Sequence, residues 1–299
     1  MVVPAPAFTP SQYGLLSVAE DRTAIFDANP NTSHWGAGII WQPLCPDGST
    51  TYDECLTVTG AGAPPPPPAK DTTFDNVRQA ATPFTVYVRK DCSIPTFWDE
   101  ATGQITESLT ESEAFEVEQA FWTGQAGAQG VVFPHLADDT PLVVDRDTLQ
   151  LAADVVDTGG AVDIVQAFGA LEQAAVECMR GAVVLHVTVA AAAALIAWDQ
   201  ITARSGVYYT ALGNKVAIGA GYTGSSPAGV ASTPASTWMY ATGPVFYARG
   251  PLMDPSPVQS VGLSTNSMEM LAERTYVVGY SCCLLAVETD LTLTICCPA

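Results

Sequence analysis

Basic residues are scarce in this chain of 299 residues. It has 11 Lys and Arg against 31 Asp and Glu, a formal net charge of −20, and no basic residue between positions 91 and 145. Nucleic-acid binding needs cations that displace counterions from phosphate, and an anionic membrane surface attracts the same charge. The composition therefore argues against both classes of binding. It suits a protein that stays soluble at high concentration, or that borders nucleic acid without adhering to it.

Long hydrophobic runs are almost missing. The first residues, MVVPAPAFTPSQYG, lack the basic and apolar regions of a secretory signal peptide, so we expect none. One stretch, Ala182–Trp198, is apolar but short, and it carries a His and a Thr near its middle. A membrane-spanning helix is one interpretation of this stretch. A buried strand over 182–187, followed by Thr188 as the N-cap of a helix over 189–203, fits it better.

Signatures of metal binding and catalysis are also missing. No two of the eight cysteines form a C-x-x-C motif, and the three histidines, His34, His135 and His186, lie far apart in sequence, so a zinc site has little support. There is no G-x-S-x-G nucleophile motif. We therefore predict no catalytic, cofactor-binding or metal-binding residue, no cofactor and no enzymatic activity.

Disulfides are not expected at synthesis, because a chain without a signal peptide meets a reducing compartment. Cys45 and Cys55 bracket a polar loop, PDGSTTYDE, and a later disulfide between them would close it. Cys282 and Cys283 are neighbours, which rarely bond to each other. In a strand we expect one of them to face inward as a small apolar residue.

Glycine is plentiful, and Gly219, Gly221 and Gly224 stand at the G-x-G-x-x-G spacing of dinucleotide-binding loops. That motif needs a strand before it, a helix starting inside it and an acidic residue about 20 positions later. A strand over 215–218 is plausible, but prolines follow and no acid stands at 240–242. The pattern predicts a packing turn between strands and not a phosphate site.

An acidic helix is predicted over 110–123. Thr110 and Glu113 form a T-x-x-E capping box, and Gly124 ends the helix. Its apolar stripe comprises Ala114, Val117, Phe121 and Trp122. Four acids lie in the early turns of this helix, namely Glu111, Glu113, Glu116 and Glu118. Such a cluster could hold a metal ion or act as a general acid, but on one helix we expect these carboxylates to form a solvated face.

The other elements follow an α+β order. A second helix is predicted over 163–179 with Gly181 as its cap. Strands are predicted over 38–41, 84–89, 237–247 (with Gly243 and Pro244 in its middle) and 291–296, and two strands that meet around 278–280 are predicted over 268–287. Residues 1–60 are rich in Pro, Gly and small polar residues, which is typical of an extended arm. Pro64–Pro68 form a stiff spacer, which fits better than an SH3 ligand because no basic residue flanks it in register.

Three segments in this order resemble the major capsid proteins of tailed bacteriophages, whose fold is shared with encapsulin shells. They are LEQAAVECMRGAVVLHVTVAAAAAL, TALGNKVAIGAGYTG and NSMEMLAERTYVVGYSCCLLAV. The order of elements matches over most of the chain. Many relatives also begin with a charged helical scaffolding segment, which we do not expect here.

The resemblance implies a division of the chain into family domains. It places an N-terminal arm at 1–60 and an extended loop at 36–90 that overlaps the arm. It also implies a peripheral domain at 91–159 and 256–299 with a spine helix at 110–123, and an axial domain at 160–255. Some relatives crosslink Lys to Asn, for which this chain offers Lys70, Lys90 and Lys215 without a motif that assigns partners.

The function implied is that of a structural major capsid protein, which self-assembles into an icosahedral shell around viral DNA. Its partners would be copies of itself in pentamers and hexamers, together with scaffolding, portal and decoration proteins. The DNA would be enclosed without specific binding, and no membrane would be involved. The chain would be made in the bacterial cytoplasm and end in the virion. Alternatives are an encapsulin-like or minor capsid component, and a β-rich carbohydrate-binding tail-associated protein.

Overall fold

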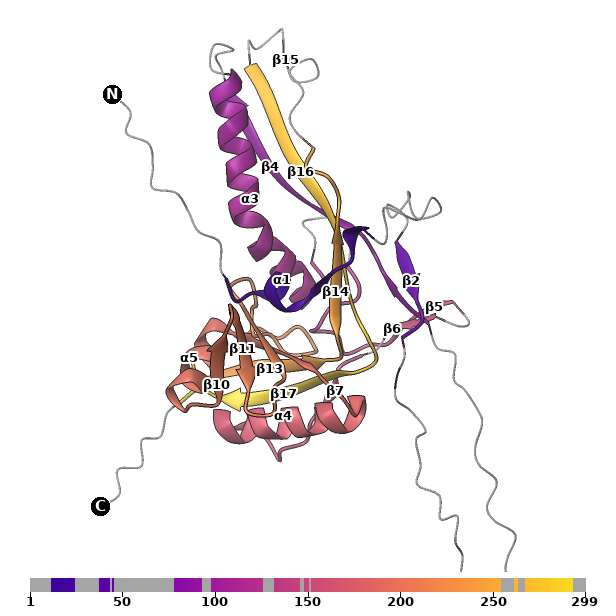
Figure 1. The fold of residues 1–299 in the computed structure, drawn as a ribbon, viewed down its shortest axis with the longest axis vertical. Helices are drawn as coiled ribbons and strands as arrows, with labels where there is room; N and C mark the ends of the chain where they lie inside the picture. The colour runs from indigo at the N-terminus through magenta and orange to yellow at the C-terminus, as the bar shows by residue number, and fades with distance from the viewer. Residues whose placement is uncertain are drawn as a thin grey trace, which may run out of the picture.

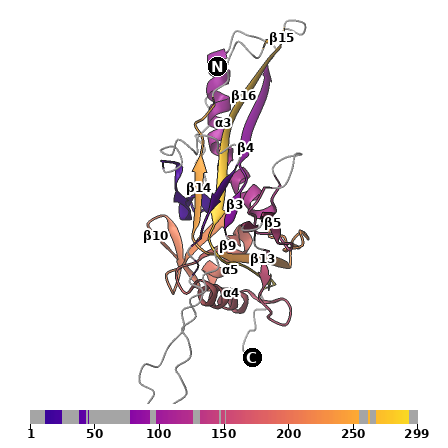
Figure 2. The same cartoon turned by 90° about the vertical axis from the view of Figure 1, so that its right-hand side faces the viewer.

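The computed structural model describes residues 12–24, 38–43, 45, 78–92, 98–125, 132–145, 148–150, 152–253, 261–262 and 267–292. One long helix, α3, runs beside a ribbon made of β4 and β16 (Figure 1). Figure 2 shows the same helix and ribbon side by side after a quarter turn. At the end of this helix lies a broader sheet, with α4 and α5 packed against it.

A five-stranded sheet contains the ribbon. Its longest strand, β16 (Ser267–Tyr280), pairs antiparallel with β4 (Phe84–Cys92), β14 (Val245–Arg249) and the short β15 (Val261–Gly262). β14 also pairs with β1 (Glu20–Asp21) in parallel. This sheet therefore joins parts of the chain that are far apart in sequence.

An eight-stranded sheet forms the broad end. Its strand order is β10-β11-β12-β9-β13-β17-β7, and β8 also pairs with β17. The pairs β12–β9, β17–β7 and β17–β8 are parallel, and the others are antiparallel. In chain order the strands are β7 (Asp154–Val155), β8 (Val162–Asp163), β9 (Val184–Thr188), β10 (Ile201–Arg204), β11 (Val207–Thr210), β12 (Lys215–Gly219), β13 (Ser236–Thr242) and β17 (Leu284–Asp290).

Both faces of the eight-stranded sheet are covered. Alternate residues of its central strands point to opposite sides, so each strand contributes side chains to both faces. On one side, Leu185 and Met239 pack with α4 (Ile164–Met179) and α5 (Val189–Ala197). On the other side, Tyr240 packs with the C-terminal half of α3. Burial on both faces explains why these strands are apolar at nearly every position.

The long helix α3 (Trp98–Thr123) begins well before the predicted start at 110. The prediction of a capping box at Thr110 is wrong, because Thr110 lies inside the helix, where its hydroxyl donates to the Thr106 carbonyl (2.9 Å). The predicted end is confirmed, since Gly124 follows the helix with a φ of +71°.

The first half of α3 has weak local helix signals, since Gly103 and several Thr interrupt it. In the folded chain, Ile105 and Leu109 are buried against the same core as Val86 and Ala272 of the ribbon. Burial of an apolar face provides most helical stability in proteins, so packing outweighs local propensity here.

The starts of α4 and α5 confirm the sequence prediction. Asp163 accepts hydrogen bonds from the N–H groups of Val165 (3.0 Å) and Gln166 (3.2 Å). Thr188 accepts from the N–H of Ala191 (3.3 Å), as an N-cap residue does.

The ends of these helices differ from the prediction. α5 stops at Ala197 and not at 203, because Asp199 adopts a φ of +54° and the chain turns back into β10. α4 is ended by Arg180, whose φ of +47° makes it the left-handed cap in place of Gly181.

The predicted strands over 38–41, 84–89, 215–218, 237–247 and 268–287 are confirmed, and the last two each divide into two strands. The strand expected over 291–296 lies outside the described residues from 293 onward.

Smaller elements complete the described fold. They are α1 (Leu15–Val18), the pair β2 (Ile39–Trp41) and β3 (Gln79–Ala81), and the pair β5 (Leu142–Asp145) and β6 (Thr148–Gln150).

The mixed α+β architecture is as predicted, whereas the domain boundaries stay a prediction. Most of the expected arm and loop, including Pro64–Pro68, lies outside the described residues. Strand pairing crosses the expected boundary at 255/256 in both sheets. β14 joins β16 in the five-stranded sheet, and β17 joins β13 in the eight-stranded sheet.

Phe121 provides a test of the core between α3 and the eight-stranded sheet. Its side chain is 1% exposed, and its ring lies 5.7 Å from His186 and 6.3 Å from Tyr280, measured between centroids. Phe121→Ala should lower the free energy of unfolding by about 3–5 kcal/mol, because it removes a buried ring and leaves a cavity. Urea denaturation of the full-length chain measures this. The control Phe115→Ala, on the exposed side of the same helix, should cost less than about 1 kcal/mol. Equal effects at both positions would contradict the assigned face.

Candidate functional site

The glycine-rich turn at 219–224 packs against α3. A Cβ atom on Gly219 would lie 2.6 Å from the Tyr222 ring, and one on Gly221 would overlap the Phe115 carbonyl of α3. Gly224 has a φ of +72°, which glycine adopts without strain. No helix starts within the described residues 220–235. The prediction of a packing turn is confirmed.

A buried carboxylate connects this turn to two other segments. Glu118 of α3 is 1% exposed. Its Oε1 accepts from the N–H of Leu15 in α1 (3.0 Å), and its Oε2 accepts from the N–H of Gly221 (3.0 Å). One side chain thus joins the N-terminal segment, the long helix and the glycine turn.

The ionisation of Glu118 reflects two opposing effects. Burial raises its pKa to about 7, although hydrogen bonds from the N–H groups of Gly221, Leu15 and Ala220 act in the opposite direction. The prediction that Glu118 lies on a solvated face of the helix is wrong. It is also wrong for Glu113, which is 6% exposed.

Glu113 holds the ribbon against α3. Both of its oxygens accept from Nη1 of Arg274 on β16, at 2.8 and 2.7 Å. The two side chains are mostly shielded from water, so this pair is screened less than a surface pair. Loss of either partner would leave a shielded charge uncompensated.

Trp122 continues the contact between α3 and the turn. Its Nε1 donates to the Ser225 hydroxyl (3.1 Å), and the Tyr240 hydroxyl donates to the Ser225 carbonyl (2.9 Å). The Trp122 ring lies 4.7 Å from Tyr222 and 4.8 Å from Tyr240. These aromatic contacts fix the turn on the helix.

His186 is fully buried beneath the turn. Its Nδ1 lies 3.0 Å from the Tyr222 hydroxyl, and its Nε2 lies 2.9 Å from the Thr242 hydroxyl. The Thr242 hydroxyl donates to the Gly243 carbonyl, so it accepts from Nε2–H, and Nδ1 accepts from Tyr222. Burial lowers the pKa of His186 to about 3, so the ring stays neutral. This histidine connects β9 to β13 and to the turn.

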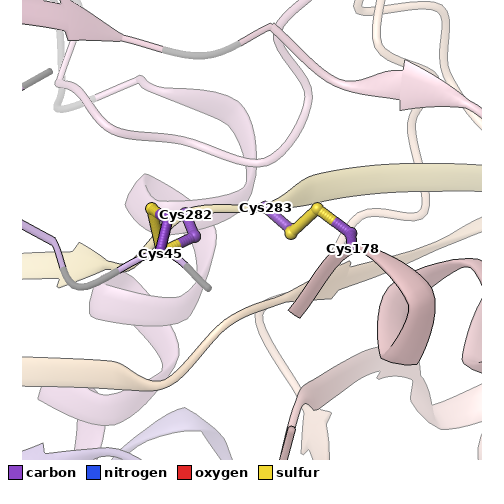
Figure 3. Close-up of a disulfide and its surroundings, with 4 residues drawn as sticks. All are labelled: Cys45, Cys178, Cys282 and Cys283. Atoms are coloured by element: carbon purple, nitrogen blue, oxygen red, sulfur yellow. A yellow bond between two sulfur atoms is a disulfide. The ribbon is translucent and has the colours of Figure 1, made fainter. Parts of the chain in front are cut away.

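The cysteines form two disulfides that the sequence did not predict. Cys45 bonds to Cys282 and Cys178 bonds to Cys283, across 237 and 105 residues of sequence. Figure 3 shows the two bonds on either side of the turn between β16 and β17. The expectations of a Cys45–Cys55 bond and of an unpaired inward cysteine in a strand are wrong, because Cys282 and Cys283 lie in a turn.

The remaining candidates are dispersed. Nζ of Lys90 donates to Gln104 (2.6 Å), and Nζ of Lys215 donates to the Val18 carbonyl (3.1 Å). Lys70 and His34 lie outside the described residues. Nδ1 of His135 lies 2.9 Å from the Val132 carbonyl. The described part of the chain holds no group of three metal-ligand side chains, and none of its helices is long and apolar enough to cross a membrane.

The sequence offered signals for part of this arrangement. The turn and the apolar stripe of α3 were visible as patterns. The Glu118 site was not, because its donors are backbone N–H groups of segments about 100 residues away in either direction. The position of Glu118 between Val117 and Ala120, which are both buried, is the one local signal that this carboxylate faces inward.

Comparisons with known proteins were made at the levels of sequence and structure. The sequence matches no protein-family model and no curated protein. A structure from Mycobacterium phage Cain matches with a TM-score of 0.54 at 14% identity, covering 96% of this chain and 93% of that chain. One from Mycobacterium phage Ogopogo matches with a TM-score of 0.51 at 14% identity, covering 97% and 96%. The capsid of Ralstonia phage GP4 has a TM-score of 0.47 at 10% identity, covering 97% and 93%.

The chain shares the fold of the two Mycobacterium phage structures. The two matches above a TM-score of 0.5 extend over nearly the whole length of both chains. The resemblance drawn from the three sequence segments is thereby confirmed at the level of fold. At this low identity the likeness concerns the fold alone, and the function is inferred separately below.

Glu118→Ala tests the role of the carboxylate as a connector. The change leaves the buried N–H groups of Leu15 and Gly221 without their acceptor, so unfolding should become easier by about 1–3 kcal/mol. The exposed neighbour Glu116 provides the control, and Glu116→Ala should change stability by less than about 0.5 kcal/mol. Urea denaturation at one pH compares the three proteins. Similar stabilities for Glu118→Ala and wild type would refute the role.

Glu118→Gln tests the raised pKa. A carboxyl whose pKa rises from 4.5 to about 7 on folding contributes stability that is fully present below about pH 4.5 and is lost as the pH rises through 7. Wild type should therefore lose stability relative to Glu118→Gln, which does not ionise, between about pH 5 and pH 8. Denaturation curves across this range give the difference. A constant difference, or one that grows in favour of wild type, would contradict the shift.

Proposed function

We propose that this chain is a structural capsid subunit, which self-assembles into an icosahedral shell that encloses viral DNA. The observation that carries the proposal is the likeness to two Mycobacterium phage structures over nearly the full length of each chain. The role of a major subunit goes beyond the fold and is part of the proposal.

Exposed apolar side chains support a subunit that is covered by neighbours. Tyr87 on the ribbon is 62% exposed, Trp198 after α5 is 55% exposed, and Leu212 between β11 and β12 is 71% exposed. They lie on different elements of the elongated molecule. In an assembled shell, contacts with neighbouring subunits would remove these groups from water.

The proposed partners follow from this role. Copies of the same chain would form pentamers and hexamers, and scaffolding, portal and decoration proteins would join them. The arm at 1–60, the loop at 36–90, and the peripheral and axial domains keep the roles that the resemblance implies, with α3 as the spine helix. The shell would assemble in the bacterial cytoplasm and become part of the virion.

Assembly of the purified chain is the decisive test. Size-exclusion chromatography and negative-stain imaging should show closed shells hundreds of ångströms wide. Deletion of residues 1–11 should abolish shells but leave a folded core, because it removes a Pro-rich part of the expected arm that needs neighbours to satisfy its backbone and keeps Leu15 and Val18, which are buried in the subunit. Circular dichroism checks that the truncated chain is folded. A wild-type monomer, or normal shells from the truncated chain, would refute the shell or the arm respectively.

The charge of the shell interior gives a second test. Because the chain carries a net charge of −20, we expect an acidic inner surface that repels packaged DNA within a Debye length of about 8 Å. Of the four acids predicted for the helix surface, Glu113 and Glu118 are buried within the subunit, so Glu111 and Glu116 remain for the inner surface of the shell. Cryo-electron microscopy of assembled shells would locate them. A neutral or basic lumen, with these acids outside or at contacts, would refute this prediction without affecting shell formation.

A further inference from the structure

The two disulfides lie where the chain passes between the sheets. β13 continues into β14 through Gly243 and Pro244, and β16 continues into β17 through residues 281–283. These two crossovers run side by side, because the N–H of Ser281 donates to the Pro244 carbonyl (3.1 Å). A Cβ atom on Gly243 would overlap the Ser281 carbonyl, so the approach is close. The crossovers together form a joint between the two sheets.

Each disulfide attaches this joint to a different side. Cys45 follows β2, whose Ile39 packs with Phe246 and Val277 of the five-stranded sheet. Cys178 lies in the last turn of α4, which packs against the eight-stranded sheet. The joint is therefore fastened to a segment on one sheet and to a helix on the other.

Two adjacent cysteines can do this because their side chains diverge. Cys282 has a φ of +67°, a left-handed conformation that residues with a Cβ atom adopt only occasionally. Figure 3 shows Cys282 turned toward Cys45 and Cys283 turned toward Cys178. The Cα–Cα separations are 5.4 and 6.3 Å, within the range that disulfides span.

We propose that Cys282 and Cys283 form an oxidation site that locks the joint between the two sheets after the chain has folded. The proposal goes beyond the capsid role and does not depend on it. The partner cysteines are 237 and 105 residues away, so the sulfurs meet only once the elements of both sheets have assembled. A chain made in a reducing compartment would fold with free thiols and be locked when it meets an oxidant.

The chemistry requires an electron acceptor, for which we name molecular oxygen. Closing each disulfide breaks two S–H bonds, forms one S–S bond, and releases two protons and two electrons. The two disulfides together release four of each, and these reduce one oxygen molecule to two water molecules. Thiols such as dithiothreitol reverse the process by exchange through a mixed disulfide.

The first experiment identifies the bonds. Full-length protein is purified under reducing conditions, and half of it is then equilibrated with air. Both halves are alkylated, digested without reductant and analysed by mass spectrometry. We expect all eight cysteines to be alkylated in the reduced half, and peptides linked Cys45–Cys282 and Cys178–Cys283 in the oxidised half. A Cys45–Cys55 or Cys282–Cys283 link, or free thiols at these four bonded positions after oxidation, would overturn the proposal.

The second experiment measures the effect of the lock. Oxidation should raise the Tm of wild type by about 5–10 °C per disulfide, because both bonds close long loops in the unfolded chain. The single variants Cys45→Ser and Cys178→Ser should each retain part of this shift, and the double variant should lose it. These variants leave the sequence of the joint intact. A full shift in the double variant would overturn the assignment of the bonds.

The third experiment separates a lock at the joint from general stabilisation, and it needs only wild type. Hydrogen exchange is compared between the oxidised and reduced forms. Reduction should speed exchange about tenfold or more at residues 38–43 and 279–284, because local opening there is no longer restrained. The paired strands β9 and β12 should keep their protection. Equal acceleration throughout the chain, or none near the joint, would overturn the proposal.

Discussion

The Glu118 carboxylate is the contact on which the central arrangement depends. It accepts N–H groups from α1 and from the glycine turn, and so brings three segments together at the point where α3 meets the eight-stranded sheet. Burying an acid is costly unless its oxygens find donors. Here the donors are backbone groups whose positions are fixed by Gly14 and Gly221, since a Cβ atom at either would overlap Glu118 or the α3 backbone. The two N–H groups can therefore reach the Glu118 carboxylate only because residues 14 and 221 are glycines.

Helix α3 transmits this arrangement to the other sheet. Its C-terminal half carries Glu118 and Phe121 into the core under the eight-stranded sheet, while Ile105 and Leu109 pack with the ribbon. Glu113, between these halves, holds Arg274 of β16. The helix thus acts as a common support for both sheets, and the two crossovers provide their covalent connection.

Local patterns in the sequence were sufficient where one segment determines its own structure. The caps at Asp163 and Thr188, and the apolar stripe at Val117 and Phe121, are decided by neighbours a few residues away. Three features depended on distant partners and were missed. The start of α3 is set by packing on the ribbon, and the burial of Glu118 depends on remote N–H groups. Cys282 and Cys283 each bond to a cysteine more than 100 residues away.

The long-range pairing of β4 with β16 affects how the chain is made on the ribosome. Residues of β4 leave the exit tunnel when their partners in β16, about 180 positions later in the sequence, have not been translated. β13, β7 and β8 likewise pair with β17, which is translated after them. Synthesis proceeds at about 5–20 residues per second, so an edge with exposed backbone groups persists for many seconds. The nascent chain therefore exposes unpaired strand edges until its C-terminal strands have been made.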